Sequence, residues 1–374
     1  MKQPKICIVT DWITAMGGVT RVDLALAEAF PDAPIYTSVY EPEGLGVTDE
    51  FGKLDIRTTW IQKFPKPLRR LHKWFPVLRT RAFRSLDLSE FDIIISSSSA
   101  ESKQVRKTRD GQIHICYCHT PIRYYWSHYD EYKHDPGMGK LNWLVRLMIP
   151  IFLPSQRRAD YKAAQKVDVF IANSTEVQKR IKEYYSRDSV VIHPPVDIDR
   201  FTKHATNKDR GGLLAVGRQV PYKRIDLAVA AANELGADLD VYGNGPEHDR
   251  LVAMAGSTVD FHIGASDEEI AEAFGEAGAF VFPTEEDFGI VQVEALAAGC
   301  PVIAYDKGGA RDIVTDGETG VFFDEQNVES LVSAIKRAGE IKFNPMILRR
   351  HARRFSKTLF IDKIRKIVRD NTPD

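Results

Sequence analysis

Short apolar runs alternate with amphipathic segments along most of this 374-residue chain, and the alternation starts twice. Such a rhythm predicts parallel β-strands joined by helices, the pattern of the α/β class. In the first half, six strands are predicted at 5–10, 35–39, 92–96, 113–117, 167–172 and 190–193. After a polar stretch, six more are predicted at 212–217, 237–242, 258–262, 279–283, 301–305 and 320–323.

The length and the restart of the pattern favour two domains. A chain of 374 residues is long for one hydrophobic core and sufficient for two. We expect a first Rossmann-like, doubly wound domain at 1–205, a second at 206–344, and a C-terminal helix within 345–374. In that last segment, Phe360 and Ile364 recur at helical spacing. Ligands of such open sheets bind at the carboxyl ends of the strands.

The composition indicates a globular protein and argues against a metal-binding or membrane-spanning one. A hydrophobic content of 43% and a net charge of −1 are typical of a globular protein. All four cysteines fall in or beside apolar runs without zinc spacing, so we interpret them as reduced core residues of a cytosolic protein and expect no metal site. We expect no secretory signal, because residues 1–10 lead directly into a strand without a charged segment followed by a long apolar one. The most membrane-like run, 141–153, is too short to span a bilayer and contains Arg146 and Pro150.

Two carboxylates, Glu286 and Glu294, lie eight positions apart across a glycine turn. The predicted strand comes before them, and 291–298 has helical spacing that ends at Gly299. The start of such a helix presents unpaired N–H groups and a positive dipole end, which suit a phosphate or a developing anion. A simpler alternative is that Glu294 only complements the helix N-terminus and that Glu286 is solvated.

This pattern resembles the E-x7-E motif of retaining glycosyltransferases of family 4, which have the GT-B fold of two Rossmann-like domains facing a deep cleft. The resemblance implies that Glu294 holds the ribose of the donor and that Glu286 contacts the donor sugar. It also implies that the amides of Phe288, Gly289 and Ile290 face the sugar and the diphosphate. In GT-B enzymes the final helix crosses back onto the first domain, and we expect the same here.

Other segments of the second domain fit the same resemblance. Arg218 and Lys223 follow a strand-ending glycine at the spacing of the family's diphosphate clamp, and two cations on one loop suit a diphosphate. Gly243 and Gly245 match the family's Gly-x-Gly-Pro turn beside the nucleotide. The later Gly-Gly pair also matches, although Asp312 stands where glutamate is usual.

Gly17 and Gly18 follow the first predicted strand and precede a helix. Paired glycines let a backbone approach a ligand closely, but they also occur in purely structural turns. They do not match the dinucleotide fingerprint, which disfavours an NAD-dependent oxidoreductase. In family 4 the same pair lies near the donor phosphate and the acceptor. Thr20 stands where a related subgroup often has glutamate, which leaves any acceptor role of that position open.

His119 ends a predicted core strand within the segment His-Thr-Pro-Ile-Arg-Tyr-Tyr-Trp. A histidine at the carboxyl end of a strand is placed to point into a ligand cleft, although a single histidine is more often structural. The segment resembles the His-Thr-Pro segment of family 4 enzymes that make lipid-linked polysaccharides. By this resemblance His119 contacts the donor sugar, while Arg123, Tyr124 and Trp126 line the acceptor side.

The resemblance implies transfer of a hexose from a nucleoside diphosphate sugar with retention of anomeric configuration. No cofactor is expected. Asp-x-Asp occurs at 197–199 and 238–240, but one lies in the predicted linker and the other in a strand, so we predict metal independence. Alternatives are a GT-B relative such as an epimerase or a sugar phosphorylase, and a non-catalytic nucleotide-sugar-binding module. The loop and histidine segments resemble enzymes of O-antigen and exopolysaccharide assembly, which favours GDP-mannose over a UDP-sugar.

Between 60 and 86 the sequence has eight Lys or Arg residues and no acid, interleaved with aromatics from Trp60 to Phe75. Such a segment suits an anionic membrane surface, and the alternative is a solvated face with its own apolar underside. With the run 141–153 it favours a polyprenyl-diphosphate-linked glycan acceptor and a cytoplasmic protein bound peripherally to the inner face of the cell membrane. No nucleic-acid recognition motif accompanies the charge.

Overall fold

The computed structural model describes residues 4–44, 50–72, 75–127, 142–204 and 210–372. The chain forms two compact units, one of Met1–His193 with Phe360–Asp374 and one of Pro194–Leu359. The domain boundary expected between residues 205 and 206 lies outside the described residues. The units divide earlier in the chain, because the helix α7 (Ile198–Thr202) buries Ile198 and Phe201 in the core of the second unit.

The N-terminal unit is built on a fully parallel sheet with the order β3-β2-β1-β4-β5-β6-β7. The direction in which strands are added reverses between β1 and β4. The strands are β1 (Ile6–Thr10), β2 (Ile35–Thr37), β3 (Ile56–Thr58), β4 (Ile93–Ser98), β5 (Ile113–Cys118), β6 (Val169–Ala172) and β7 (Val190–Val191).

The sequence prediction of six strands for this sheet was wrong by one, because β3 was missed. This strand has only three residues and pairs with β2 alone, with Ile56 opposite Ile35. Arg57 and Thr58 are exposed. An edge strand needs no continuous apolar run, so nothing in its sequence distinguishes it from a loop.

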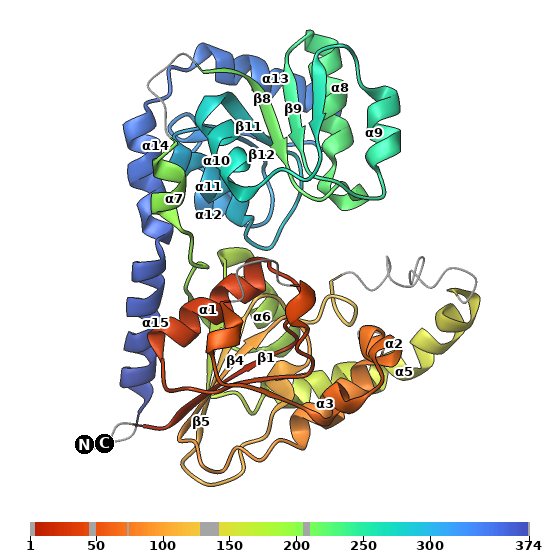
Figure 1. Ribbon diagram of the computed structural model, residues 1–374, viewed down its shortest axis with the longest axis vertical. Helices are drawn as coiled ribbons and strands as arrows, with labels where there is room; N and C mark the ends of the chain where they lie inside the picture. The colour runs from red at the N-terminus through yellow and green to blue at the C-terminus, as the bar shows by residue number, and fades with distance from the viewer. Residues whose placement is uncertain (1–3, 45–49, 73–74, 128–141, 205–209, 373–374) are drawn as a thin grey trace. The chain divides into compact units, whose positions relative to one another are not determined.

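Helices cover both faces of this sheet, as Figure 1 shows for α1 and α3. Its cores contain Ile8 and Leu26 on one face and Val9 and Phe83 on the other. The helices are α1 (Gly18–Ala29), α2 (Lys66–Arg70), α3 (Pro76–Arg84), α5 (Asn142–Ala164) and α6 (Thr175–Tyr185), with 3-10 turns η1 (Pro42–Gly44), η2 (Phe51–Lys53), η3 (Trp60–Lys63) and η5 (Ser102–Gln104).

The C-terminal unit has a second parallel sheet with the order β10-β9-β8-β11-β12-β13, which reverses between β8 and β11. All six strands predicted for it are confirmed. They are β8 (Gly211–Val216), β9 (Leu239–Tyr242), β10 (Val259–His262), β11 (Ala277–Phe282), β12 (Val302–Tyr305) and β13 (Gly320–Phe323). The strands β11, β12 and β13 are almost entirely buried and are therefore short apolar runs, whereas β9 and β10 each have an exposed aspartate among apolar residues.

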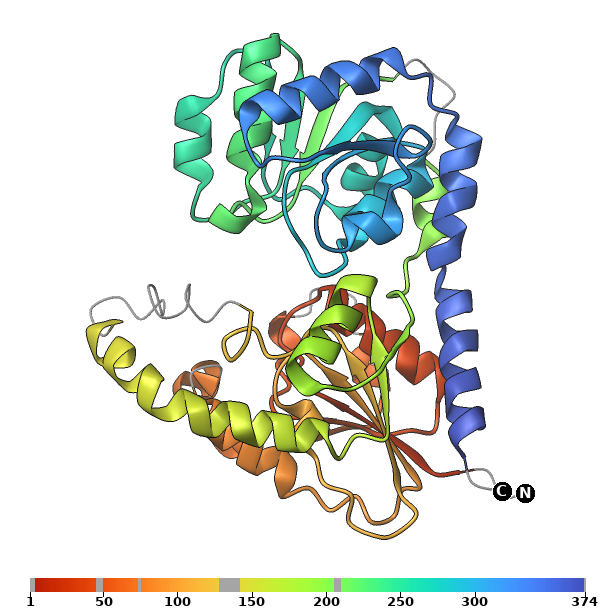
Figure 2. The ribbon, with the colours of Figure 1, turned by 180° about the vertical axis from the view of Figure 1, so that it is seen from behind.

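Two helical layers enclose this sheet, and Figure 2 shows α13 beside α8 on one of its faces. On the other face α10, α11 and α14 form the second core. The helices are α8 (Ile225–Leu235), α9 (His248–Met254), α10 (Asp267–Glu276), α11 (Ile290–Ala298), α12 (Ala310–Ile313), α13 (Val328–Glu340) and α14 (Pro345–Ala352), with 3-10 turns η7 (Pro221–Lys223) and η8 (Arg353–Phe355).

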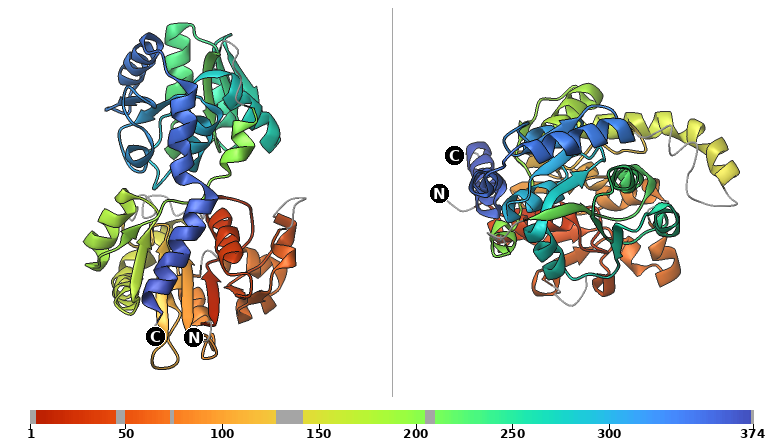
Figure 3. Two further views of the ribbon diagram at one scale, coloured as in Figure 1. Left: turned by 90° about the vertical axis from the view of Figure 1, so that its left-hand side faces the viewer. Right: turned by 90° about the horizontal axis from the view of Figure 1, so that it is seen from above.

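The C-terminal segment forms two helices, whereas one was predicted. The first, α14, buries Leu348 in the C-terminal unit. The second, α15 (Lys357–Asn371), belongs from Phe360 onward to the N-terminal unit, where it runs along the strands (Figure 3, left). The ring of Phe360 packs against that of Tyr117 at 5.6 Å, and Arg365 donates a hydrogen bond to the carbonyl of Ala29 at 3.1 Å. The helix therefore completes the core of the first unit.

Candidate functional site

The reversal between β8 and β11 defines where the C-terminal sheet can bind a ligand. In open α/β sheets, the loops at the carboxyl ends of the two strands that flank such a reversal diverge and leave a crevice. The loop after β8 carries Arg218 and Lys223, and the loop after β11 carries Glu286. The fold therefore brings three of the predicted site residues to the same end of one sheet.

Lys223 and Glu286 are in direct contact. The ammonium group of Lys223 forms an ion pair with the Glu286 carboxylate, and their side chains are 15% and 21% exposed. Lys223 also lies over the ring of Phe282, with its nitrogen 5.9 Å from the ring centroid. A second link joins the same loops, because Thr284 Oγ1 donates a hydrogen bond to the carbonyl of Tyr222 at 2.9 Å. The loops after β8 and β11 thus form one connected surface.

Arg218 lies on that surface with its side chain exposed. Within the part of the chain that the structure describes, its guanidinium forms no hydrogen bond or ion pair. Arginine presents several N–H donors in a planar fork that fits phosphate oxygens. An exposed guanidinium at the carboxyl end of β8 is therefore available to an anionic ligand.

Gly243 and Gly245 owe their identity to close backbone packing. A Cβ atom at Gly243 would lie 2.1 Å from the carbonyl oxygen of Gly217, and one at Gly245 would lie 2.2 Å from that of Gln219. No side chain fits at such distances. Both glycines, predicted to contact the donor, therefore hold the loops after β8 and β9 together, whatever else they contact.

Gln219 organises the same two loops and was missed by the sequence analysis. Its side chain is fully buried, donates from Nε2 to the Gly243 carbonyl at 2.9 Å, and contacts His248 Nδ1 through Oε1 at 2.8 Å. Its backbone N–H donates to the carbonyl of Asn244 at 3.0 Å. A glutamine in a polar loop carries no signal of burial, so only the tertiary structure identifies it.

The helix α11 begins directly after the glycine turn, as predicted. Gly289 has φ of 84°, a left-handed conformation that favours glycine, and the helix starts at Ile290. Phe288 is buried against the ring of Phe355 at 5.7 Å. Glu294, one turn into the helix, is only 6% exposed. The first turn of α11 therefore presents N–H groups next to Glu286, with a second carboxylate one turn further along the helix.

In the N-terminal unit, the strand order reverses between β1 and β4, and Asp11 connects the loops that follow these two strands. The sequence analysis did not single out this residue. Its buried carboxylate accepts hydrogen bonds from the N–H groups of Ser99, Ala100 and Ser102, each at 2.7 Å. The predicted glycines Gly17 and Gly18 lie at the start of α1 and are exposed. Since nothing lies within 4 Å of a Cβ added to either glycine, the space beside this turn is open.

His119 lies directly after β5, next to the loop that Asp11 anchors. Its ring is 7% exposed, and its Nε2 lies 2.9 Å from Ser97 Oγ. The ring also packs edge-on against Tyr117, with the centroids 5.1 Å apart. Most of the imidazole is therefore enclosed by its own unit, and its orientation is set by a hydrogen bond to β4.

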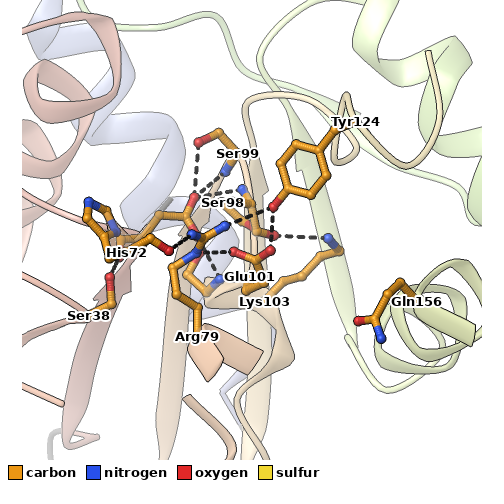
Figure 4. Close-up of polar contacts among 12 residues, drawn as sticks. Ser38, His72, Arg79, Ser98, Ser99, Glu101, Lys103, Tyr124 and Gln156 are labelled. Carbon is orange, nitrogen blue, oxygen red and sulfur yellow. Dashed lines mark hydrogen bonds and ion pairs between the residues drawn. The ribbon is translucent and has the colours of Figure 1, made fainter. Parts of the chain in front are cut away.

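The predicted acceptor residues Arg123, Tyr124 and Trp126 are partly exposed and share one turn. Figure 4 shows the Tyr124 hydroxyl directed at Arg79 and Glu101. It accepts a hydrogen bond from Arg79 at 3.0 Å and donates one to the Glu101 carboxylate. Arg79 and Glu101 form an ion pair at 2.6 Å with side chains 1% and 0% exposed. Burial raises the pKa of Glu101, and the Arg79 charge opposes that shift.

A second buried pair anchors the other end of this turn. Lys103 lies 2.7 Å from Asp160 of α5, and both side chains are almost fully buried. The same aspartate accepts hydrogen bonds from the indole of Trp126 at 2.9 Å and from the hydroxyl of Tyr185 at 2.7 Å. The turn that carries the predicted acceptor residues is thus held at both ends by buried charges. Neither pair was predicted, because their partners are distant in sequence.

No group of three or more His, Cys, Asp or Glu side chains suited to a metal ion occurs among the described residues. Within the same residues, no helix has both the length and the hydropathy required to cross a bilayer. All four cysteines are buried and unpaired.

Comparison with known families covers almost the entire chain. Residues 16–200 match the family described as Glycosyltransferase Family 4, and residues 196–357 match Glycosyl transferases group 1. The two matches meet where the two units divide. The chain belongs to the GT-B glycosyltransferases. The fold predicted from the sequence is therefore confirmed.

Individual relatives agree with this membership. A D-inositol 3-phosphate glycosyltransferase of Geodermatophilus obscurus is 29% identical over 63% of this chain and 67% of its own. A GDP-mannose-dependent alpha-(1-6)-phosphatidylinositol monomannoside mannosyltransferase of Mycolicibacterium smegmatis is 30% identical over 49% of this chain and 56% of its own. The chain thus spans between about half and two thirds of the length of these curated relatives.

Solved GT-B structures match over nearly the full length. The Anabaena protein HepE, in complex with UDP and glucose, superposes with a TM-score of 0.68 at 16% identity and covers 98% of this chain and 99% of its own. At this identity the likeness concerns the fold.

Proposed function

We propose that this chain transfers a hexose from a nucleoside diphosphate sugar to a hydroxyl group of a glycan acceptor, with retention of anomeric configuration. The observation that carries the proposal is the contact between Lys223 and Glu286, which joins the loops after β8 and β11 directly before the first turn of α11. Cations, helix N–H groups and a carboxylate at one sheet end suit a ligand with both phosphates and sugar hydroxyls.

Each residue then has a role that follows from its chemistry. Breaking the bond between sugar and diphosphate places negative charge on the leaving oxygen. Arg218, Lys223 and the first N–H groups of α11 stabilise that charge, and one well-placed donor is worth about 3–4 kcal/mol to the barrier. The nearly buried Glu294 accepts hydrogen bonds from the ribose hydroxyls, while Glu286 positions Lys223 and contacts the donor sugar.

The two cations of the loop after β8 also concern whether the reaction requires a metal ion. Arg218 and Lys223 supply two positive charges where other glycosyltransferases need a divalent ion, so we propose that transfer is metal-independent. His119 contacts the donor sugar in this scheme, with its ring orientation fixed by Ser97. No protein nucleophile is required, because the departing phosphate oxygen accepts the proton of the acceptor hydroxyl.

For the donor we propose GDP-mannose, and a UDP-sugar is the alternative. Support comes from the His-Thr-Pro and Glu-Asp-Phe-Gly-Ile segments, and from the GDP-mannose-dependent relative of M. smegmatis. For the acceptor we propose a polyprenyl-diphosphate-linked glycan beside Arg123, Tyr124 and Trp126. Such an acceptor places the protein at the cytoplasmic face of the cell membrane, in keeping with the basic residues between 60 and 86.

The experiment that tests the proposal compares donors in the presence of EDTA. Binding and hydrolysis of GDP-mannose, UDP-glucose, UDP-N-acetylglucosamine and UDP-galactose are measured for the wild type and for Glu294→Ala. We expect one donor to be turned over selectively and Glu294→Ala to abolish it. NMR of the first-formed sugar anomer tests retention. Donor binding without turnover on any glycolipid acceptor would favour a non-catalytic binding module instead.

A further inference from the structure

A groove of about 550 Å³ lies between α3 and α5 on the N-terminal unit, outside the sites described above. Five of the residues that line it are cationic, and none is acidic. The cations are Arg84 at the end of α3, Arg106 in the loop after η5, Arg158 and Lys162 on α5, and Lys166 in the turn after α5. Figures 1 and 2 show α3 and α5 side by side at this place.

These charges have no anionic partner among the residues that the structure describes. Arg84 donates a hydrogen bond to the neutral amide of Gln104 at 2.6 Å, and the other four make no ion pair there. The adjacent Lys107 behaves differently, because it is paired with Asp168 at 2.7 Å. Burial, and secondarily the charge of Arg106, lowers the pKa of Arg84. The groove therefore concentrates positive charge that the chain itself leaves uncompensated.

The arrangement on α5 is costly without a counter-ion. Arg158 and Lys162 are one helical turn apart on the same face, and like charges at this spacing destabilise a helix. The helix C-terminus favours Lys162 in the last turn of α5 and Lys166 just after it, but that explanation does not extend to Arg158. An anion that bridges Arg158 and Lys162 would offset their repulsion.

Exposed apolar side chains occur on the same two helices. Tyr161 lines it and is 38% exposed, and Phe152, three turns earlier than Lys162 on α5, is 50% exposed. Phe75, directly before α3, and Val77 in its first turn are exposed as well, at the end of α3 opposite to Arg84. Aromatic and aliphatic side chains beside uncompensated cations are the pattern of a surface that enters the headgroup region of a bilayer.

We propose that the groove between α3 and α5 binds the phosphate groups of anionic membrane lipids and docks the N-terminal unit on the membrane. The inference rests on the proposed function in one respect, because that function places the acceptor in a membrane. It adds a lipid site separate from the predicted acceptor turn. Charge complementarity selects anionic over zwitterionic lipid, and the exposed apolar side chains select a lipid over a free phosphate.

The test is co-sedimentation of the full chain with vesicles of phosphatidylcholine, with or without phosphatidylglycerol. The variant is Arg158→Gln with Lys162→Gln and Lys166→Gln. A matched control removes the same charge at three exposed residues, with Lys336→Gln, Lys342→Gln and Lys363→Gln. Since each cation near an anionic surface contributes about fivefold to partitioning, we expect the first variant to bind anionic vesicles about 100-fold more weakly and the control to bind as the wild type does.

Several results would overturn the inference. One is wild-type vesicle binding that does not depend on phosphatidylglycerol. Another is an equal loss of vesicle binding in both variants, and a third is binding of soluble polyphosphate in place of vesicles. Calorimetry of nucleoside diphosphate binding by the same proteins distinguishes a failure of the groove inference from a failure of the proposed function. The groove variant should keep that affinity, so loss of vesicle binding alone concerns the groove. Absence of nucleotide binding in the wild type would count against the transferase and leave the vesicle result to stand by itself.

Discussion

The ammonium group of Lys223 and the carboxylate of Glu286 form an ion pair between residues that are 63 positions apart in the chain. The pair connects the loops that follow two neighbouring strands of the C-terminal sheet, on either side of the point where the strand order reverses. Lys223 thus has a carboxylate partner within the chain, and under the proposed function a donor diphosphate would compete with that carboxylate for Lys223.

This competition predicts opposite effects of two substitutions. Lys223→Ala should weaken binding of nucleoside diphosphate by about 10- to 100-fold, because a hydrogen bond between charged groups is lost. Glu286→Gln should leave that binding equal or stronger, since the competing charge is removed, while it lowers the rate of sugar transfer. Isothermal titration calorimetry and a transfer assay measure the two quantities. Equal weakening of nucleotide binding by both variants would contradict the prediction.

Glu294 predicts discrimination between sugars of the nucleotide. Its carboxylate is nearly buried one turn into α11, and in the proposed function it accepts hydrogen bonds from the hydroxyls of the ribose. The wild type should bind a ribonucleoside diphosphate about tenfold more tightly than its 2′-deoxy form, and Glu294→Ala should bind both equally. Competition binding with the two nucleotides checks this. Glu340→Ala, at the exposed end of α13, is the control and should keep the wild-type preference.

Much of the C-terminal unit was predictable because its information is local. Its strands are apolar runs bounded by turns, and the glycine before α11 marks the helix start in the sequence itself. The residues that carry the proposed chemistry, such as Glu286 and Lys223, lie at strand ends. Since the carboxyl ends of parallel strands share one edge, their proximity follows from the fold class.

The features that were missed depend on tertiary contacts. Arg79 and Glu101 are 22 positions apart in polar segments, and nothing near either residue indicates that both are buried. Gln219 and Asp11 are likewise defined by the loops that they hold. The basic segment between 60 and 86 was predicted as one charged surface, yet Arg69 pairs with Glu41 and Arg79 is enclosed. Charge patterns alone do not distinguish an inward side chain from an exposed one.

Close backbone packing at Gly309 predicts a local effect of a single methyl group. A Cβ atom there would lie 2.3 Å from Phe288 Cα and 2.7 Å from the Asp287 carbonyl oxygen, so Gly309→Ala must displace the loop that carries Glu286. Because misplacement of a catalytic loop by about 1 Å costs about 100-fold in rate, we expect a loss of that order in transfer activity. Steady-state kinetics measure it.

The matched control is Gly339→Ala in α13, where an added Cβ meets nothing within 4 Å. This variant should keep full activity and gain about 0.5–1 kcal/mol in stability, because alanine is the better helix former. If Gly309→Ala retained wild-type kinetics, the backbone position of the loop would not matter for transfer.

The buried ion pair predicts a large and non-additive effect on stability. Glu101→Gln leaves the Arg79 charge buried without its partner, and breaking such a pair costs about 3–5 kcal/mol. The double variant Arg79→Met with Glu101→Gln should be less destabilised than the sum of its single variants. Urea unfolding measures each value. Arg337→Met, which breaks the exposed pair with Asp316, should cost less than about 1 kcal/mol.

Asp23 predicts a dependence of stability on pH. Its carboxyl group is buried on α1 and accepts a hydrogen bond from Thr10 Oγ1 at 2.8 Å, and burial raises its pKa from 3.8 to about 7. Between these values the folded protein binds a proton that the unfolded chain has released. The contribution of Asp23 to stability is therefore complete below pH 4 and falls as the pH rises to 7, by up to about 4 kcal/mol.

The measurement is the difference in unfolding free energy between the wild type and Asp23→Asn across this range of pH. His114 acts in the opposite direction, because burial lowers its pKa to about 4 and acidification below 6.5 costs stability. The effect of His114 on stability is the same in both proteins, so it cancels in the difference. The stability of the wild type relative to Asp23→Asn should decline as the pH rises from 4 to 7 and stay constant above 7. A difference that does not change with pH would mean that Asp23 is charged in the folded protein throughout.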